Sequence, residues 1–435
     1  MFYKINTYGC QMNVHESEKI AGILENMGYS HTDIDQEADI ILFNTCCIRE
    51  NAEDRLFGNV GALKSLKMQK KDLIIVVVGC MTQQQGMAEL LRKKHPYVDI
   101  ILGTSNIEEL ASAIIDHKKK KHIVSIVDPT VDADKKLPIY RTSYPNAWVN
   151  IMYGCNNFCT YCIVPYVRGR ERSRKESDIL DDCKKILDQG YKEITLLGQN
   201  VDSYGSDLQG YNFSSLLSKV ASLGGKYRVR FMTSHPKDFN DETISVIAEN
   251  PNICNNIHLP VQSGSTAVLK AMNRKYTRES YLEIIEKIRN KIPNCGITSD
   301  IMVGFPTETD KDYQDTLSLT RQVRFSNAFT FVYSPRVGTP ASKMVQLPDE
   351  VKKERVTALV NLQNAISKEI SGEYIGKTME ILVEDVNPKY DGCVCGRTDT
   401  GRLVTFKGDK SLIGSFKNVK INEIQSSALF GDVEE

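Results

Sequence analysis

The sequence of residues 155–162 is Cys155-Asn156-Asn157-Phe158-Cys159-Thr160-Tyr161-Cys162, and it follows a predicted strand at Trp148–Met152. Three thiolates at this spacing (the core set: Cys155, Cys159 and Cys162) suit a cubane iron–sulfur cluster, because each sulfur can bind one iron corner. The fourth iron is left open, and an open position on a bound metal is where a small molecule can bind and react. Two simpler interpretations remain: a zinc site, whose fourth ligand is missing nearby, and three buried thiols, which the polar loop disfavours.

The strand before this loop is the first of six in a series that begins at about residue 146. Helical periodicity separates the strands, and a last helix is predicted at Asp349–Ser371. Six βα units favour an incomplete barrel, in which reactive groups lie in loops after the strand C-termini, where Cys155 falls. The strands are predicted at Trp148–Met152, Glu193–Leu197, Val229–Thr233, Asn256–Pro260, Thr298–Val303 and Ala328–Tyr333.

A second set of cysteines lies within residues 1–116, where short apolar runs alternate with helical periodicity. This alternation favours a parallel, Rossmann-like α/β domain. Cys10, Cys46 and Cys80 (the N-terminal set) each follow one of its first three predicted strands, which places them on one edge of the sheet. They fit a second cluster with one open iron, although each cysteine alone is more often a small buried residue. On spacing alone, Cys47 competes with Cys46 for the middle position.

Two further segments complete the predicted organisation. Residues 117–145 are rich in Lys, Asp and Pro and indicate a linker, in which Ile123–Val127 has the character of an edge strand. In residues 373–435 short apolar runs alternate with Gly and Asp turns, which favours a small β-barrel. The sequence thus predicts an α/β domain (1–116), a linker (117–145), a barrel core (146–372) and a small β-barrel (373–435).

Composition excludes several classes of protein. The 435 residues include 55 basic and 55 acidic side chains, so a polyanionic partner must be held by local patches. The longest apolar run, Leu73–Val78, is too short to cross a bilayer, and Met1–Lys4 does not introduce a secretory signal. We therefore expect a cytoplasmic protein without a membrane segment. In a reducing compartment its 12 cysteines are more often metal ligands or catalytic groups than disulfides.

The core set resembles the signature of the radical S-adenosylmethionine (SAM) enzymes, which is CxxxC, one residue, an aromatic residue and Cys. Tyr161 occupies the aromatic position, which in that superfamily lies against the adenine of SAM. The resemblance implies that SAM chelates the open iron. An electron from the cluster then cleaves SAM to methionine and a 5′-deoxyadenosyl radical.

The whole layout resembles the methylthiotransferases, in which an α/β domain with three cysteines precedes a radical SAM domain and a TRAM β-barrel. The motifs are most similar to the branch that modifies N6-isopentenyladenosine in tRNA, the MiaB type. In this family Cys46, rather than Cys47, aligns with the ligand, and Tyr153 stands where Glu is common. The matching motifs are Thr7–Asn13, Asn44–Cys46, Ile48–Glu50, Val164–Pro165, Arg168–Gly169, Leu197–Val201, Thr233–Pro236, His258–Gly264, Asp300–Pro306 and Tyr333–Pro335.

The resemblance implies that C–SCH3 replaces the C–H at adenine C2 of N6-isopentenyladenosine next to the anticodon. An aromatic C–H is too strong and too weakly acidic for ordinary acid–base catalysis, which gives a radical route its physical reason. The family relationship implies two [4Fe-4S] clusters, one on each cysteine set, and two SAM molecules per turnover. It also implies an external flavodoxin- or ferredoxin-like electron donor and proteins that supply replacement sulfur.

Other site residues are predicted from their positions. Polar residues near the ends of barrel strands are candidates for binding SAM or adenine, with strand-end capping as the alternative. With Tyr161, they are Gln199, Thr233, Ser234, Gln262 and Asp300. Arginines after the core set are candidates for binding tRNA phosphates, although charge runs are usually solvated faces. They are Arg168, Arg170, Arg172 and Arg174, and a second basic group surrounds Arg274.

The prediction is therefore a radical SAM methylthiotransferase acting on tRNA. One alternative is the same chemistry on N6-threonylcarbamoyladenosine or on a ribosomal protein, although the run Asn44–Glu50 is closer to the isopentenyl branch. An alternative of another class is a non-catalytic RNA-binding iron–sulfur protein or electron carrier. Open irons argue against a carrier, because carriers usually close all four positions with thiolates.

Overall fold

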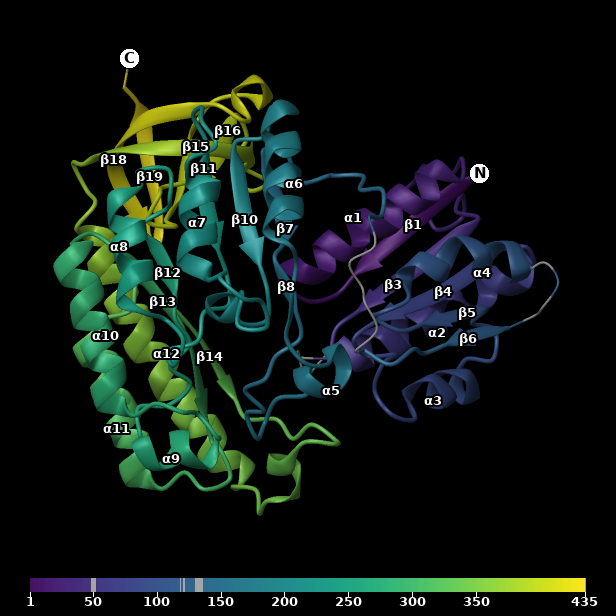
Figure 1. Ribbon diagram of the computed structural model, residues 1–435, viewed down its shortest axis with the longest axis horizontal. Coiled ribbons are helices and arrows are strands. Elements are labelled where there is room, and N and C mark those ends of the chain that lie inside the picture. The colour runs from purple at the N-terminus through teal and green to yellow at the C-terminus, as the bar shows by residue number, and fades with distance from the viewer. Residues whose placement is uncertain (48–51, 118, 120–121, 130–135, 435) are drawn as a thin grey trace. The chain divides into compact units, whose positions relative to one another are not determined.

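The computed structural model describes residues 1–47, 52–117, 119, 122–129 and 136–434. The chain divides into two compact units (Figure 1). Unit 1 comprises Met1–Thr142, Tyr153–Asn156 and Cys162–Arg172. Unit 2 comprises Ser143–Met152, Asn157–Tyr161 and Ser173–Glu435. The division passes through the core set, so that Cys155 and Cys162 belong to unit 1 and Cys159 to unit 2.

Unit 1 is built on a parallel sheet in the order β2-β1-β3-β4-β5-β6. β3 and β4 are buried over their whole length, as expected of central strands that are covered on both faces. β6 lies at one edge of this sheet, where the sequence predicted an edge strand at Ile123–Val127 within the linker. The strands are β1 (Phe2–Thr7), β2 (Ser30–His31), β3 (Ile40–Thr45), β4 (Ile74–Gly79), β5 (Ile100–Leu102) and β6 (Ile123–Ser125).

Helices cover both faces of this sheet (Figure 1). Successive side chains of a strand point to opposite faces. In β3, Ile40 and Leu42 therefore pack with α1 and α4, whereas Ile41 and Phe43 pack with α2 and α3. These elements are α1 (Gln11–Asn26), α2 (Ala52–Gln69), α3 (Met87–Lys94), η1 (Ile107–Glu109) and α4 (Leu110–His117). The helical pattern of the sequence at residues 17–27 predicts a helix that begins at Ser17, but α1 begins earlier, directly after Cys10.

The six strands predicted for the incomplete barrel are present in unit 2. They form two parallel three-stranded sheets, β11-β10-β7 and β12-β13-β14, and an isolated parallel bridge joins Val229 of β11 to Ile253. The strands are β7 (Asn146–Asn150), β10 (Glu193–Leu197), β11 (Arg228–Phe231), β12 (Asn256–His258), β13 (Gly296–Val303) and β14 (Asn327–Val332).

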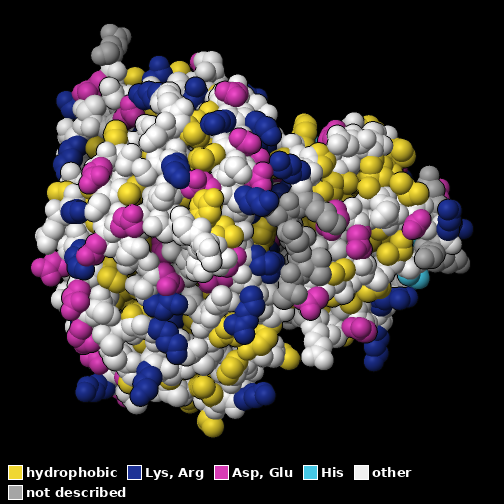
Figure 2. Space-filling model, in the orientation of Figure 1, with side chains coloured by type: hydrophobic (Ala, Val, Ile, Leu, Met, Phe, Trp, Pro, Cys, Tyr) yellow, Lys and Arg dark blue, Asp and Glu magenta, His cyan; other side chains and the backbone are white. Residues whose placement is uncertain are grey.

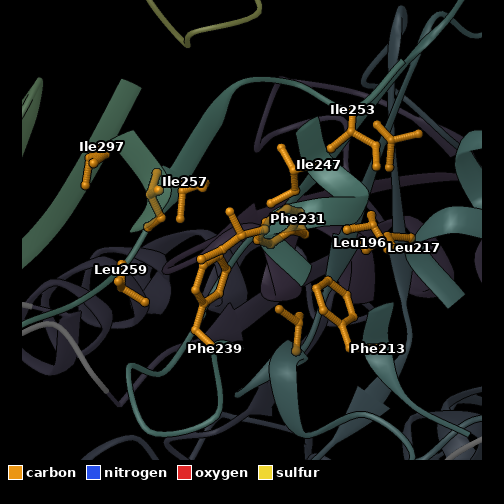
Figure 3. Close-up of a cluster of buried hydrophobic side chains, with 14 of the residues drawn as sticks. Leu196, Phe213, Leu217, Phe231, Phe239, Ile247, Ile253, Ile257, Leu259 and Ile297 are labelled. Atoms are coloured by element: carbon orange, nitrogen blue, oxygen red, sulfur yellow. The ribbon is translucent and has the colours of Figure 1, made fainter. Parts of the chain in front are cut away.

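Helices between these strands bury the outer side of the barrel. Figure 3 shows part of this core, in which Leu196, Phe231 and Ile257 from strands meet Phe213 and Ile247 from helices. The helices of unit 2 are α6 (Glu176–Asp188), η2 (Val201–Ser203), α7 (Phe213–Ala221), α8 (Asp241–Glu249), α9 (Thr266–Ala271), α10 (Arg278–Lys291), α11 (Asp310–Val323), η3 (Pro340–Lys343) and α12 (Asp349–Gly372). Three short elements accompany the core set: β8 (Met152–Tyr153), α5 (Val164–Arg168) and β9 (Arg172–Ser173).

The C-terminal part of unit 2 is a closed barrel in the order β15-β16-β17-β19-β18, which confirms the predicted small β-barrel. Its strands are β15 (Thr378–Val386), β16 (Cys393–Arg397), β17 (Leu403–Lys407), β18 (Phe416–Gln425) and β19 (Ala428–Val433), with η4 (Lys410–Leu412) between β17 and β18. Arg228 and Arg230 of β11 donate hydrogen bonds to its backbone carbonyls, which attaches it to the larger barrel. No helix within the described residues is both long enough and apolar enough to span a membrane.

Candidate functional site

The cysteines of the N-terminal set lie at the carboxyl edge of the unit 1 sheet. Cys10 immediately precedes α1, Cys46 follows β3, and Cys80 follows β4. The last residues of β3 and β4 are paired in register, and the amide of Cys80 donates to the carbonyl of Thr45 over 3.0 Å. Cys46 and Cys80 are therefore held on adjacent strand ends, as the sequence predicted.

Gly9 brings the Cys10 loop against Cys46. Its φ of +121° lies in the region that favours glycine, and a Cβ at this position would lie 2.6 Å from the Cβ of Cys46 and 3.0 Å from its Sγ. The side-chain amide of Asn13 also connects the two loops, because it donates hydrogen bonds to the backbone carbonyls of Tyr8 and Thr45. The backbone thus brings the three predicted ligand positions to one edge.

Cys47 also lies at this edge, packed with Cys80, Ile163 and Val167 in a small buried cluster. Its hydrogen bond to Cys80, together with burial, raises the pKa of the Cys47 thiol well above its usual value. The same hydrogen bond and the charge of Arg168 lower the pKa of Cys80 to about 7 against the opposing effect of burial. Arg168 and Cys47 therefore stabilise the thiolate form of Cys80, with Cys47 acting as the hydrogen-bond donor.

Arg168, at the end of α5, points into unit 1. It is only 7% exposed, and its Nε donates to Cys80 Sγ over 3.2 Å. Its two terminal nitrogens donate to the two carboxylate oxygens of Glu16 over 2.6 and 3.1 Å. A guanidinium in this position is not presented to solvent, which differs from the predicted contact between Arg168 and tRNA phosphates.

The other three predicted phosphate contacts differ in their exposure and in their hydrogen-bond partners. Arg170 is exposed. Arg172 donates to the carbonyl of Arg170 over 2.9 Å, and Arg174 pairs with Asp182 over 2.9 Å. Figure 2 shows Lys and Arg side chains interspersed with Asp and Glu on the visible face of unit 2. Of the four predicted phosphate contacts, Arg170 is the one that is exposed.

The loop of the core set is held by a close backbone approach at one end and by the side chain of Asn273 in its middle. Gly154 precedes Cys155 with a φ of +78°, and a Cβ there would lie 2.0 Å from the carbonyl oxygen of Arg170. In unit 2, the amide of Asn273 donates to the carbonyls of Asn157 and Phe158 over 3.2 and 2.9 Å. These bonds fix the polar loop around the buried Cys159, which is 7% exposed.

Arg274 lies beside Cys159 rather than in a surface patch. It is 8% exposed, and one terminal nitrogen is 3.5 Å from Cys159 Sγ and 3.4 Å from the Tyr161 hydroxyl. Tyr161, predicted to lie against SAM, is half-buried and packs beside a cluster that includes Met272 and Phe305. Arg274, from the second basic group of the sequence, is therefore buried beside the core set.

A buried carboxyl, Asp202, organises the turn after β11. It accepts hydrogen bonds from the Ser234 hydroxyl over 3.3 Å and from the His235 amide over 2.8 Å. Burial raises its pKa to about 8, and the nearby Asp238 adds to the shift. Burial also lowers the pKa of His235 to about 2, so this imidazole is neutral. Ser234 and the exposed Thr233, whose φ is +76°, belong to this turn.

The remaining predicted SAM or adenine contacts lie at nearby strand ends, with one exception. Gln199 follows β10 and is half-buried. Gln262 follows β12 at a φ of +65°, with its side-chain oxygen buried and without a hydrogen-bond partner among the described residues. Asp300 is the exception: it lies within β13, inside the predicted strand Thr298–Val303, and its carboxylate is 3.5 Å from His258 Nε2.

Two aromatic residues that the sequence analysis did not select extend this side of the sheet. Phe329 and Phe331 of β14 are paired in register with Asp300 and Met302, and they are 59% and 37% exposed. Ala328 and Val332, which alternate with them on the opposite face of β14, pack in the core. Phe329 also meets the His258 ring edge-on at 6.1 Å. In the sequence, apolar residues at alternate positions indicate which face of β14 is buried. This pattern does not show that the face carrying Phe329 and Phe331 stays exposed.

The two cysteine sets fit iron–sulfur clusters in donor chemistry. Thiolates are the ligands that such clusters prefer, and the surroundings of Cys80 lower the pKa of its thiol. Within the described residues, no three His, Cys, Asp or Glu side chains are grouped closely enough to hold a single metal ion. A cluster spreads its thiolates over separate irons. The motif Ile48–Glu50 lies outside the described residues.

Three family models match consecutive parts of the chain. The model of the uncharacterized protein family UPF0004 matches residues 3–103, and that of the radical SAM superfamily matches residues 149–320. The TRAM domain matches residues 372–433, which include the closed barrel. Each model therefore falls on one of the three predicted folded parts.

Two similar proteins that match nearly the whole chain carry the same name. A protein of Thermoanaerobacter pseudethanolicus called tRNA-2-methylthio-N(6)-dimethylallyladenosine synthase is 50% identical over 438 residues, covering 100% of this chain and 93% of its own length. A protein of the same name from Clostridium botulinum (strain Loch Maree / Type A3) is 52% identical over 431 residues, covering 98% and 96%.

Solved structures share the fold at low sequence identity. The radical SAM methyltransferase TsrM from Kitasatospora setae, with tryptophan and a SAM analogue bound, has a TM-score of 0.58 and 12% identity over 78% of this chain and 75% of that chain. The cobalamin-dependent radical SAM enzyme OxsB has a TM-score of 0.55 and 13% identity over 83% and 56%.

Proposed function

The chain belongs to the family of tRNA-2-methylthio-N(6)-dimethylallyladenosine synthases, and we propose that its two cysteine sets hold the two [4Fe-4S] clusters of this radical SAM methylthiotransferase. Cys10, Cys46 and Cys80 are the proposed ligands of the N-terminal cluster. Cys155, Cys159 and Cys162 are the proposed ligands of the core cluster. The substrate is tRNA, with adenine C2 of N6-isopentenyladenosine as the atom modified.

One observation supports this proposal above the others: parts of both cysteine sets fold into one compact unit. α5 begins two residues after Cys162, and within unit 1 it packs on Cys47 and Cys80. Thr104 donates to the carbonyl of Val167 over 2.9 Å, and Arg168 donates to Cys80. A reaction that uses both sets at one substrate atom requires such proximity.

When bound, the clusters and two SAM molecules per turnover supply a hydrogen-abstracting radical, a sulfur atom and a methyl group. The protein's own residues bind and orient the reactants. We assign Tyr161 and the strand-end residues Gln199, Thr233, Ser234 and Gln262 to SAM. We assign the open face with Asp300 and Phe329 to the adenine, because aromatic rings stack on bases and a carboxylate accepts amine hydrogens.

The proposed reaction needs partners that supply electrons and sulfur. An external flavodoxin- or ferredoxin-like donor supplies electrons, and sulfur-supply proteins restore the sulfur that each turnover consumes. The exposed Arg170 and the closed barrel contribute to tRNA binding through phosphate charge and shape. Because tRNA is the substrate, we expect the protein to act in the cytoplasm.

The decisive experiment is mass spectrometry of nucleosides from tRNA incubated anaerobically with reconstituted protein, SAM and a reductant. We expect 2-methylthio-N6-isopentenyladenosine and 5′-deoxyadenosine. Release of 5′-deoxyadenosine without the modified base would support the radical chemistry but show that the substrate is a different one. Neither product, from protein with both clusters loaded, would contradict the proposed function.

The ligand sets are tested separately by iron content. A triple variant with Cys155→Ala, Cys159→Ala and Cys162→Ala should retain about half the iron of the wild-type chain, since three thiolates hold each cluster. The matched control replaces Cys183 by Ala, because this thiol is fully buried in the barrel core and belongs to neither set. Complete loss or complete retention of iron in the triple variant would contradict two independent sites.

A further inference from the structure

Each cysteine set has a buried arginine that donates a hydrogen bond to one of its sulfurs. Arg168 Nε lies 3.2 Å from Cys80 Sγ in unit 1, and Arg274 Nη1 lies 3.5 Å from Cys159 Sγ in unit 2. The two arginines are 7% and 8% exposed. Arginine is rarely buried unless it is paired, so the same contact in two different units is a specific arrangement.

Contacts on every nitrogen fix the guanidinium of Arg168. Nε donates to the sulfur of Cys80, while Nη1 and Nη2 donate to the two carboxylate oxygens of Glu16 over 2.6 and 3.1 Å. Nη2 also donates to Asn13 Oδ1 over 3.2 Å. Glu16 is itself buried, and it offsets part of the positive charge near Cys80. Lysine keeps the charge but has no planar fork with which to make these bonds.

Arg274 is fixed by a different set of acceptors. Its Nε donates to the Tyr276 hydroxyl over 2.9 Å, and its Nη2 donates to the carbonyl of Pro260 over 3.0 Å. The remaining terminal nitrogen faces Cys159 and Tyr161. These acceptors are neutral oxygens and a sulfur. The charge of Arg274 therefore acts on Cys159 without the carboxylate that accompanies Arg168.

We propose that Arg168 and Arg274 are positioning residues that set the reduction potentials of the N-terminal and core clusters, each through one ligand sulfur. This inference rests on the proposed ligand sets. Hydrogen bonds to a ligand sulfur and a fixed positive charge stabilise the reduced form of a cluster, because that form carries one more negative charge. Each arginine raises the potential of its own cluster, and Arg274 does so more strongly because Glu16 partly offsets Arg168.

The test uses the full chain, reconstituted anaerobically with iron and sulfide. Iron and sulfide are counted first, and the protein is then titrated with dithionite while electron paramagnetic resonance follows the reduced clusters. The signal that is absent from the core-set triple alanine variant belongs to the core cluster. The variants are Arg274→Met, Arg274→Lys, Arg168→Lys and the pair Arg168→Gln with Glu16→Gln, which leaves no unpaired buried carboxylate.

We expect the Arg274 variants to lower the midpoint potential of the core signal and the Arg168 variants to lower that of the N-terminal signal. Arg274→Lys should shift the potential less than Arg274→Met, because it retains the charge. Arg230→Lys is the matched control, since Arg230 of β11 is a largely buried arginine paired with Glu193 of β10, and it should move neither potential.

Full cluster loading with unchanged potentials in the Arg168 and Arg274 variants would overturn the inference. Equal shifts of both signals in every variant would overturn the assignment of one arginine to each cluster. A wild-type chain that does not load two clusters would instead contradict the proposed function, and this result appears before any arginine is changed.

Discussion

Arg168 donates a hydrogen bond from its Nε to the sulfur of Cys80 over 3.2 Å, although 88 positions separate the two residues. The bond joins the segment after Cys162 to the end of β4 within one compact unit. The loop that carries one cysteine set is therefore secured to a sulfur of the other. A change in either loop is expected to affect the other loop as well.

Replacing Cys46 by Ala should abolish methylthiolation while cleavage of SAM stays measurable, because the core set is intact. Cys47→Ala should retain methylthiolation, since this residue serves as hydrogen-bond donor to Cys80. Nucleoside mass spectrometry and 5′-deoxyadenosine release, measured on the same samples, check both expectations. If Cys47→Ala abolishes the product and Cys46→Ala does not, the assignment of the middle ligand must be reversed.

Phe329→Ala should raise the KM for tRNA about 10-fold, because loss of one base-stacking ring costs about 1–3 kcal/mol. The ring is 59% exposed and lies beside His258 and Asp300. Phe329→Tyr is the control, as it keeps the ring, and it should retain a KM close to that of the wild type. Equal KM values for the Ala and Tyr variants would exclude stacking by this residue.

Arg170→Ala together with Arg172→Ala should weaken tRNA binding and reduce the slope of log Kd against log salt by about 1. Arg170 should account for most of the effect, because Arg172 is engaged with two backbone carbonyls. Binding measured at several salt concentrations gives the slope. Lys287→Ala, which removes an exposed lysine paired with Asp241, is the control. An unchanged slope in the double variant would show that these arginines do not contact phosphates.

Asp202→Asn should remove a pH dependence of stability. The pKa of Asp202 is raised to about 8 by burial, whereas an aspartate in an unfolded chain has a pKa of about 3.9. Between these values the folded chain holds the extra proton, so the free energy of unfolding falls as the pH rises. One proton gives a loss of about 2 kcal/mol between about pH 6 and pH 8.

Thermal unfolding midpoints at these two pH values check this prediction. The wild-type midpoint should fall more between them than that of Asp202→Asn. The exposed Asp241→Asn serves as the control and should behave as the wild type does. If the wild type and Asp202→Asn lose the same stability, the Asp202 carboxyl does not hold its proton in the folded chain.

The sequence predicted the six strands of the incomplete barrel and the longer strands of the unit 1 sheet, because apolar runs mark buried strands locally, whereas the two-residue β2 was not predicted. β4 is a continuous apolar run, and the cysteines follow the ends of β1, β3 and β4 as expected. The start of α1 was missed because its first turns carry polar residues such as Asn13 and Glu16 that are buried. Their partners, among them Thr45 and Arg168, come from distant segments and leave no periodic signal nearby.

The directions of individual charged side chains could not be predicted in the same way. Arg168 and Arg170 belong to one basic run, yet one is buried against Glu16 and Cys80 while the other is exposed. In each case the outcome depends on which acceptor or partner strand tertiary folding brings near, and a single sequence does not encode that locally.

The C-terminal barrel is closed by its last strand, β19. β19 pairs with both β17 and β18, in parallel with the first and antiparallel with the second. A chain shortened to end before Ala428 would leave both neighbours with a row of unsatisfied amide and carbonyl groups, which is a template for association with other chains. The final strand thus protects the protein from aggregation at an open sheet edge, and C-terminal truncations and fusions should leave β19 intact.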